Sequence, residues 1–226
     1  MFATEAEVRD CLPIWTVGRG ELRATTYIRR EMPIGHCIPD VVYVRASEDD
    51  RVQWAPRNWT YKHACVIWAL RRHAELDMRG LGRLLYEKVD RLDRTVRDLV
   101  ACGAIEGGGS ESLRLSAGVA EMRAEVTAVE IKLHRWREAL RQAASYRDFA
   151  DRVVVAMDEE RLGSGGAPLA PFATAGVGLI AVGRASSEWL VEPESDVADG
   201  LGPYHDYIIG SALSRRGHTL WLRRND

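Results

Sequence analysis

Asp40, Glu130 and Lys132 supply two carboxylates and an ammonium that could form one hydrolytic site. Glu130 and Lys132 lie two residues apart in a β-branched segment, so both side chains should project from the same face of a strand. Asp40 follows Pro39 and directly precedes the apolar residues 41–44, which predict a second strand. If the two strands are neighbours, Asp40 and Glu130 can hold a hard divalent cation through carboxylate oxygens. The spacing therefore predicts a divalent-metal site with a lysine beside it.

Each of these residues also has a purely structural explanation. Asp40 can be a turn residue, since Pro-Asp is a common turn dipeptide. Glu130 and Lys132 can be a solvated pair on an edge strand. Apolar residues occur on either side of them in the same segment, at Val126, Ala128, Ile131 and Leu133. This argues against an exposed edge, because a charged pair inside an apolar strand needs partners.

The surrounding sequence predicts an α/β domain interrupted by an insertion. A helix is expected over residues 4–14, because Thr4 and Glu7 make a capping box before an apolar stripe. β-Forming runs predict strands over residues 21–30, 41–44, 125–133, 152–156 and 177–182, and near 189–191. Further helices are expected over residues 136–146 and 204–215.

The inserted segment is helical and rich in arginine. Helices are expected over residues 62–73 and near 81–85, and a third from Asp90, as N-cap, to Gly103. Residues 104–106 and 112–115 then flank three glycines as a hairpin. This order resembles the winged-helix family, although a helical hairpin with a Gly-rich connector would give a similar pattern. The expected domains are the insertion, residues 59–118, and a core formed by residues 1–58 and 119–226.

The core resembles the PD-(D/E)XK nuclease superfamily, which shares its fold with restriction endonucleases. Pro39-Asp40 matches the first half of its signature and Glu130-Ile131-Lys132 the second. Downstream, Gln142 and Tyr146 fit the Q-h-x-x-Y helix signature of RecB-like members, which implies contact with nucleic acid. Ordinary packing of Tyr146, with Gln142 capping a backbone group, is the alternative. The resemblance covers nearly all of the chain outside the insertion and implies a restriction-endonuclease-like mixed-sheet core.

The resemblance also implies a chemistry, that of a magnesium-dependent deoxyribonuclease in which Mn²⁺ can replace Mg²⁺. Asp40, Glu130 and the Ile131 carbonyl would coordinate the metal, and Lys132 would position or deprotonate the attacking water. A bound metal lowers the pKa of water, and a fixed lysine supplies positive charge where negative charge develops. Many members add a glutamate from the first helix, and two candidates remain open: Glu7 and Glu31.

The third expected helix offers contacts to DNA through Arg91, Arg94 and Arg97. In a winged helix these side chains would meet phosphates or the major groove. Aspartates are interleaved with them, at Asp90, Asp93 and Asp98. An ion-paired, solvated helix face is therefore the alternative.

Composition limits the function classes. A hydrophobic fraction of 46% and a charged fraction of 28% are ordinary for a globular protein. No apolar run approaches the roughly 20 residues that cross a bilayer, so we expect no membrane partner and a cytoplasmic location. The net charge of −2 argues against indiscriminate coating of nucleic acid, although local arginine clusters can still contact phosphates. Neither the four cysteines nor the six histidines have zinc-site spacing.

Two functions from different classes remain. The first is a nuclease that hydrolyses DNA phosphodiester bonds, with the insertion contacting nucleic acid or a partner. The second is a non-catalytic DNA-binding or regulatory protein that uses a nuclease-like scaffold. A scaffold has no physical need for two acids and a lysine around one point, which favours catalysis. A homodimer formed through the apolar C-terminal strands is an additional expectation.

Overall fold

The computed structural model describes residues 1–12, 24–47, 55–108, 112–122, 124–163, 168–195 and 201–214. The chain forms two compact units. Unit 1 comprises Met1–Leu22, Ile28–Arg45 and Glu125–Gly200, and unit 2 comprises Arg23–Tyr27, Ala46–Ala124 and Leu201–Asp226.

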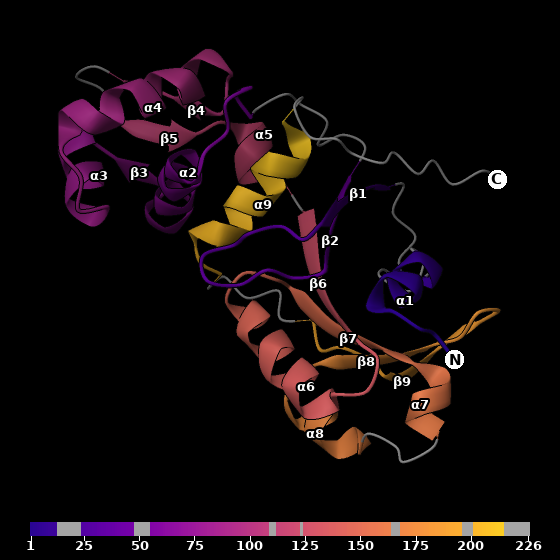
Figure 1. The fold of residues 1–226 in the computed structure, drawn as a ribbon. Helices are drawn as coiled ribbons and strands as arrows, with labels where there is room; N and C mark the ends of the chain where they lie inside the picture. The colour runs from indigo at the N-terminus through magenta and orange to yellow at the C-terminus, as the bar shows by residue number, and fades with distance from the viewer. Residues whose placement is uncertain are drawn as a thin grey trace. The chain divides into compact units, whose positions relative to one another are not determined.

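A six-stranded sheet has the strand order β1-β2-β6-β7-β8-β9 (Figure 1). Its strands are β1 Ala24–Arg30, β2 Val41–Ser47, β6 Ala124–Lys132, β7 Arg152–Asp158, β8 Gly178–Val182 and β9 Ser187–Val191. The β6–β7 and β7–β8 pairs are parallel, and the β8–β9 pair is antiparallel. This mixed sheet with its helices confirms the expected α/β class. It also confirms that β2 and β6 are neighbours, although the whole insertion separates them in the sequence.

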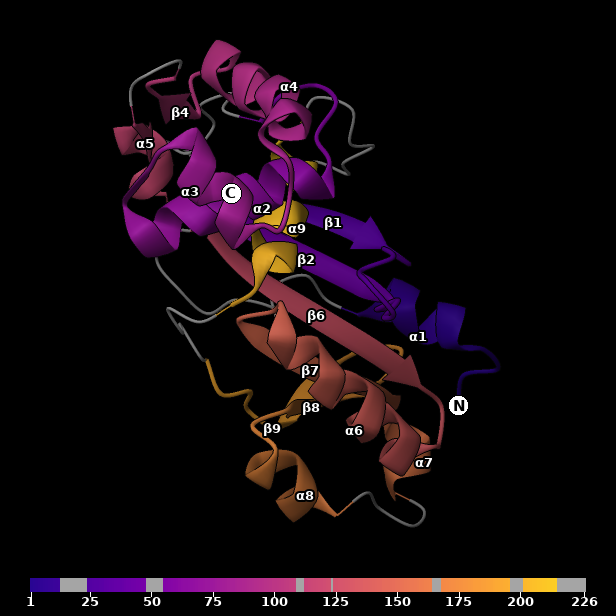
Figure 2. The same cartoon turned by 90° about the vertical axis from the view of Figure 1, so that its left-hand side faces the viewer.

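Helices on both faces explain why the central strands are so apolar. Helix α1, Glu5–Cys11, contributes Val8 to a core cluster on one face, where it meets alternate sheet residues such as Val129 and Ile131. Helix α6, Trp136–Ala144, connects the parallel strands β6 and β7 and lies over the opposite face (Figure 2). Because side chains alternate along β6, Glu130 falls on the α6 side of the sheet.

Helix α1 begins where the capping pattern predicts. Thr4 is the N-cap, and its Oγ1 accepts a hydrogen bond of 3.3 Å from the Glu7 amide. The Glu7 carboxylate, however, accepts from the Ala3 amide at 3.0 Å instead of completing a capping box with Thr4. The last expected helix residues, 13 and 14, lie outside the described residues, as do residues 21–23 of the first expected strand.

Unit 2 contains the three expected helices and the expected hairpin. They are α2 Tyr61–His73, α3 Met78–Leu84, α4 Val89–Ala101, β4 Ile105–Glu106 and β5 Leu113–Leu115. The short strand β3, Glu75–Leu76, was not expected; it follows α2 and pairs with β5, giving an antiparallel sheet of order β3-β5-β4. The four-residue helix α5, Ala117–Ala120, follows the hairpin.

Residues 201–214 belong to unit 2 together with the insertion. The domain boundaries expected from the sequence had assigned them to the core. These residues include helix α9, Pro203–Leu213, which packs against α2. Its buried Asp206 accepts a hydrogen bond of 3.1 Å from Arg71 of α2. The Trp59 indole also donates to the Tyr207 carbonyl of α9 at 3.0 Å. These contacts join segments that are far apart in the sequence.

Helix α4 differs from the expectation at its start. Lys88 is its N-cap, so the prediction that Asp90 caps the helix is wrong. Asp90 lies in the first turn, where its negative charge is favourable for the helix dipole. Two short helices of unit 1 were also not expected: α7 Glu159–Gly163 and α8 Leu169–Thr174. Within the described ranges, no helix is both long and apolar enough to cross a bilayer.

Candidate active site

Glu130 and Lys132 meet on one face of β6, near the end of an internal strand. The Lys132 ammonium donates a hydrogen bond of 2.7 Å to Glu130 Oε1. The Glu130 side chain is 4% exposed and that of Lys132 is 15% exposed. β6 has β2 on one side and β7 on the other, so the alternative of a solvated pair on an edge strand is wrong. The two groups form a buried ion pair.

Asp40 precedes β2 and lies beside the end of β6. Its Oδ2 accepts a hydrogen bond of 2.7 Å from the Ile131 amide. Burial raises the pKa of the Asp40 carboxyl above its usual value. The Glu130 charge adds to this rise, while the Ile131 hydrogen bond and the Lys132 charge offset part of it. Asp40 is thus close enough to the ion pair to interact electrostatically with both of its members.

Lys132 is held in its charged form by the acids around it. Burial alone would lower its pKa, but the hydrogen bond and charge of Glu130 outweigh burial, so the pKa is raised. Glu5 adds to the rise, with its Oε1 4.0 Å from the Lys132 ammonium. Lys132 therefore pairs directly with the buried Glu130 and also feels the negative charge of the partly buried Asp40.

Tyr146 belongs to this cluster. It lies in a short 3₁₀ helix, Ser145–Asp148, that directly follows α6. Its side chain is buried, and its hydroxyl donates a hydrogen bond of 2.5 Å to Glu130 Oε2. Burial and this hydrogen bond raise the pKa of the Tyr146 phenol. The Q-h-x-x-Y resemblance implied a contact with nucleic acid, whereas the structure directs the hydroxyl to a carboxylate of the same chain.

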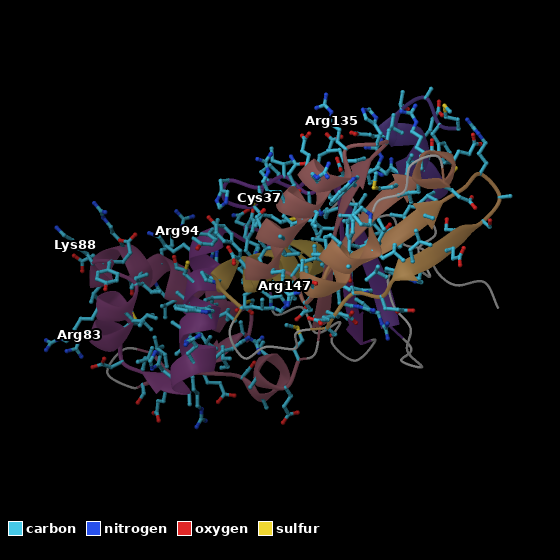
Figure 3. The ribbon with its side chains drawn as sticks, turned by 90° about the horizontal axis from the view of Figure 1, so that it is seen from below. Cys37, Arg83, Lys88, Arg94, Arg135 and Arg147 are labelled. Carbon is cyan, nitrogen blue, oxygen red and sulfur yellow. The ribbon has the colours of Figure 1, made fainter. Side chains whose placement is uncertain are left out.

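Gln142 lies one helical turn before Tyr146, on α6. Its Oε1 is buried and has no hydrogen-bond partner among the described residues. The Ser145 hydroxyl instead bonds the Gln142 backbone carbonyl at 2.7 Å. Cys37, labelled in Figure 3, is a neighbour that the sequence patterns did not single out, with its Sγ 3.4 Å from Ser145 Oγ. Within the described part of the chain, Gln142 Oε1 is thus a buried acceptor without a donor.

Glu7 and Glu31, the two glutamates considered as a third acid of the site, are both engaged elsewhere. Glu7 accepts from the Ala3 amide and lies 3.3 Å from Arg184. Glu31 is paired with Arg9 at 3.3 Å. Glu5 is the acid of the first helix that approaches Lys132. No sequence signal separated Glu5 from Glu7, since an acid in the first turn of a helix is favourable at either position.

The cluster can be compared with what a hard cation requires. In the part of the chain that the structure describes, no group of three or more His, Cys, Asp or Glu side chains could hold a metal ion. Mg²⁺, however, is commonly bound by only one or two carboxylates, with water and substrate phosphates completing its shell. Asp40 and Glu130 supply such a pair. The N–H and C=O of a strand residue point to the same side, so the Ile131 carbonyl is turned toward Asp40 like its amide.

The three arginines expected to contact DNA are exposed on α4. Two of them form ion pairs one helical turn away: Arg97 with Asp93 at 2.8 Å, and Arg91 with Glu87 at 4.0 Å. Arg94, labelled in Figure 3, has no ion pair within the described residues. The ion-paired alternative thus describes Arg91 and Arg97 but not Arg94.

Asp40, Glu130, Lys132 and Tyr146 thus form one cluster at the end of β6. Comparison with known proteins finds no matching family model, no matching curated protein and no matching solved structure.

Proposed function

We propose that the chain is a magnesium-dependent nuclease that hydrolyses DNA phosphodiester bonds. In this proposal unit 1 has a restriction-endonuclease-like core of the PD-(D/E)XK type, and unit 2 is a winged helix that contacts nucleic acid. The main support is the gathering of Asp40, Glu130 and Lys132 around the end of one internal strand. Burying two acids and a lysine destabilises a fold unless they are paired, and a purely structural role would be met equally well by apolar residues.

Each residue has a role that follows from its surroundings. Asp40 and Glu130 would hold Mg²⁺ together with the Ile131 carbonyl, and Mn²⁺ would be accepted by the same oxygens. The metal, when bound, supplies a Lewis acid that lowers the pKa of water and stabilises charge on the phosphate. Lys132 has a raised pKa, so it remains an ammonium at neutral pH and positions the attacking water or a phosphate oxygen instead of removing a proton.

Tyr146 acts through Glu130 in this proposal. Its hydroxyl and the Lys132 ammonium bond different oxygens of the Glu130 carboxylate. Two donors on opposite oxygens leave the carboxylate little freedom to rotate, which orients its remaining lone pairs. Tyr146 is therefore a positioning residue and need not touch DNA.

The second candidate is a non-catalytic DNA-binding or regulatory protein. One observation favours it: both Glu130 oxygens already have hydrogen-bond donors within the chain, so the carboxylate is satisfied without a metal. Binding of DNA without cleavage of any DNA form would support this candidate.

The test is a cleavage assay on linear single-stranded, linear duplex and supercoiled DNA, with Mg²⁺, Mn²⁺ or EDTA. Lys132→Met should reduce the rate by about 10²-fold or more, the size expected for losing one preorganised electrostatic contact. Arg152→Met is a matched control, because the Arg152 side chain is as buried as that of Lys132 and pairs with Glu125 at 3.5 Å, near the start of β6. Cleavage in EDTA, or equal loss in both variants, would refute the assignment.

A further inference from the structure

Tyr86 is a large aromatic side chain that the fold of unit 2 leaves in solvent. It lies between α3 and α4 and is 97% exposed. Its backbone has a φ of 54°, in the left-handed region. A bulky residue rarely adopts this conformation, whereas glycine and asparagine adopt it readily. Neither the packing nor the backbone of unit 2 therefore accounts for a tyrosine here.

The turn that presents Tyr86 is well defined. The Glu87 amide donates to the Gly82 carbonyl at 2.9 Å, and the Tyr86 amide donates to the Arg83 carbonyl at 3.4 Å. A Cβ on Gly82 would come within 2.8 Å of the Glu87 carbonyl oxygen, so the two segments are in close contact. A packed turn holds the ring outward and lowers the entropy lost when a ligand stacks on it.

Two cations lie close to Tyr86 in the sequence, Arg83 three residues before it and Lys88 two residues after it. Arg83 and Lys88 are exposed, and neither has an ion pair or side-chain hydrogen bond within the described residues. Figure 3 shows both side chains projecting from the outer edge of unit 2. The intervening acid, Glu87, is neutralised by Lys62 at 2.9 Å and by Arg91 at 4.0 Å. The turn and the residues beside it, which we call the tip (residues 83–88), thus carry an exposed aromatic ring and two exposed cations that have no ion pair among the described residues.

We propose that Tyr86, Arg83 and Lys88 form a binding surface for single-stranded nucleic acid. Tyr86 stacks on an unpaired base, and the two cations contact the phosphates on either side of it. Stacked aromatics with basic side chains are the usual means of binding single strands without sequence preference. A base in a duplex is already stacked on both faces, so a protruding tyrosine ring fits an unpaired base better. The negative phosphates also match the charge of the tip, which an apolar protein partner would not.

This surface lies on the turn before α4 and is separate from Arg91, Arg94 and Arg97 of the helix itself. It rests on the part of the proposed function in which unit 2 contacts nucleic acid, and it does not depend on cleavage. Binding is therefore measured in EDTA, where metal-dependent cleavage is absent. Absence of cleavage by the protein would therefore not change the binding measurement. Absence of single-strand binding at Tyr86 would likewise not change the cleavage assay.

The experiment uses the full chain and fluorescence anisotropy with labelled oligonucleotides: single-stranded DNA, single-stranded RNA of the same sequence, and the DNA duplex. Tyr86→Asn removes the ring while tolerating the left-handed backbone. It should weaken binding of the single strand roughly tenfold, a typical loss for one stacked aromatic. Tyr86→Phe keeps the ring face and should bind like the parent. The DNA and RNA arms show which single strand is preferred.

The contribution of the Arg83 and Lys88 charges is measured from the salt dependence of binding. Arg83→Gln with Lys88→Gln should reduce the slope of log affinity against log salt by about 1.4, or about 0.7 for each phosphate contact with a single strand. Arg72→Gln is the matched control, because Arg72 is an exposed arginine of unit 2 that lies over the Trp68 ring. Its salt slope should be unchanged.

Three results would overturn the proposal. One is parental affinity in Tyr86→Asn, and another is duplex binding as tight as single-strand binding. The third is parental affinity for the single strand in Tyr86→Leu, which keeps apolar area without a ring face, so that stacking would not contribute to binding. Melting curves from circular dichroism check that each variant is folded, which is expected because all the altered side chains are exposed.

Discussion

Replacing Lys132 by methionine tests whether the buried carboxylates form a cation site. The ammonium lies 2.7 Å from Glu130 Oε1, and both side chains are largely buried. Removing one member of a buried ion pair destabilises a protein by about 3 to 5 kcal/mol, because the other charge is left unpaired. We expect the lower value, about 3 kcal/mol, since Lys132 keeps some contact with solvent. In a chain of this size, that loss lowers Tm by roughly 6 to 12 °C.

Magnesium should restore much of this loss. A divalent cation between Asp40 and Glu130 would replace the missing positive charge, and at 100 times its Kd a ligand stabilises the folded state by about 2.7 kcal/mol. The parent protein should gain less, because Lys132 already neutralises part of the site and repels the cation. Differential scanning calorimetry in EDTA and in Mg²⁺ measures both effects. The expected result is a larger Mg²⁺-induced rise in Tm for Lys132→Met than for the parent.

The Mg²⁺-induced rise in Tm decides whether the two carboxylates bind the cation. If Mg²⁺ raises the Tm of Lys132→Met no more than that of the parent, the two carboxylates do not hold the metal. Arg152→Met serves again as the control, because its partner Glu125 is near the opposite end of β6 and is 31% exposed. It should lower Tm without any selective rescue by Mg²⁺.

Three further predictions concern the same cluster. Asp40→Asn keeps an acceptor for the Ile131 amide but loses the carboxylate charge, so calorimetric titration should show Mg²⁺ binding at least about tenfold weaker, with DNA binding in EDTA retained. Tyr146→Phe should lower the free energy of unfolding by about 2 kcal/mol, as expected for a lost hydrogen bond to a charged group, and should reduce kcat; a rise in KM for DNA alone would instead indicate a direct contact with nucleic acid. Burial raises the pKa of Asp40 above its ordinary value of 3.8, so Asp40 binds a proton more tightly in the folded protein than in the unfolded one. Without metal, the contribution of Asp40 to the free energy of unfolding should therefore fall as the pH rises from 3.8 through the raised pKa. Denaturant titrations that give the same dependence of this free energy on pH for the parent and for Asp40→Asn would contradict the prediction.

Local sequence patterns predicted most of the elements. Alternation and β-branching located the strands, and apolar stripes located α2, α4 and α6, because these signals depend only on which residues one element must bury. The same alternation placed Glu130 and Lys132 on one face of β6, and the structure confirms it through their 2.7 Å hydrogen bond. The predicted start of α4 at Asp90 was wrong, because aspartate is favourable in the first turn of a helix as well as at the N-cap.

Tertiary structure decided everything that joins distant segments. The approach of Asp40 to Ile131 depends on β2 and β6 being neighbours across the insertion, a pairing that no local pattern contains. Helix α9 packs on α2 and its Asp206 accepts a hydrogen bond from Arg71, which the order of elements could not reveal. The exposure of Tyr86 was equally hidden, since a tyrosine between two helices is usually packed against them. Sequence alone thus determined the helices and strands and the chemical types of side chain at the site. Only the folded chain decided which of these side chains contact one another, because contacts between distant segments depend on how the whole chain packs.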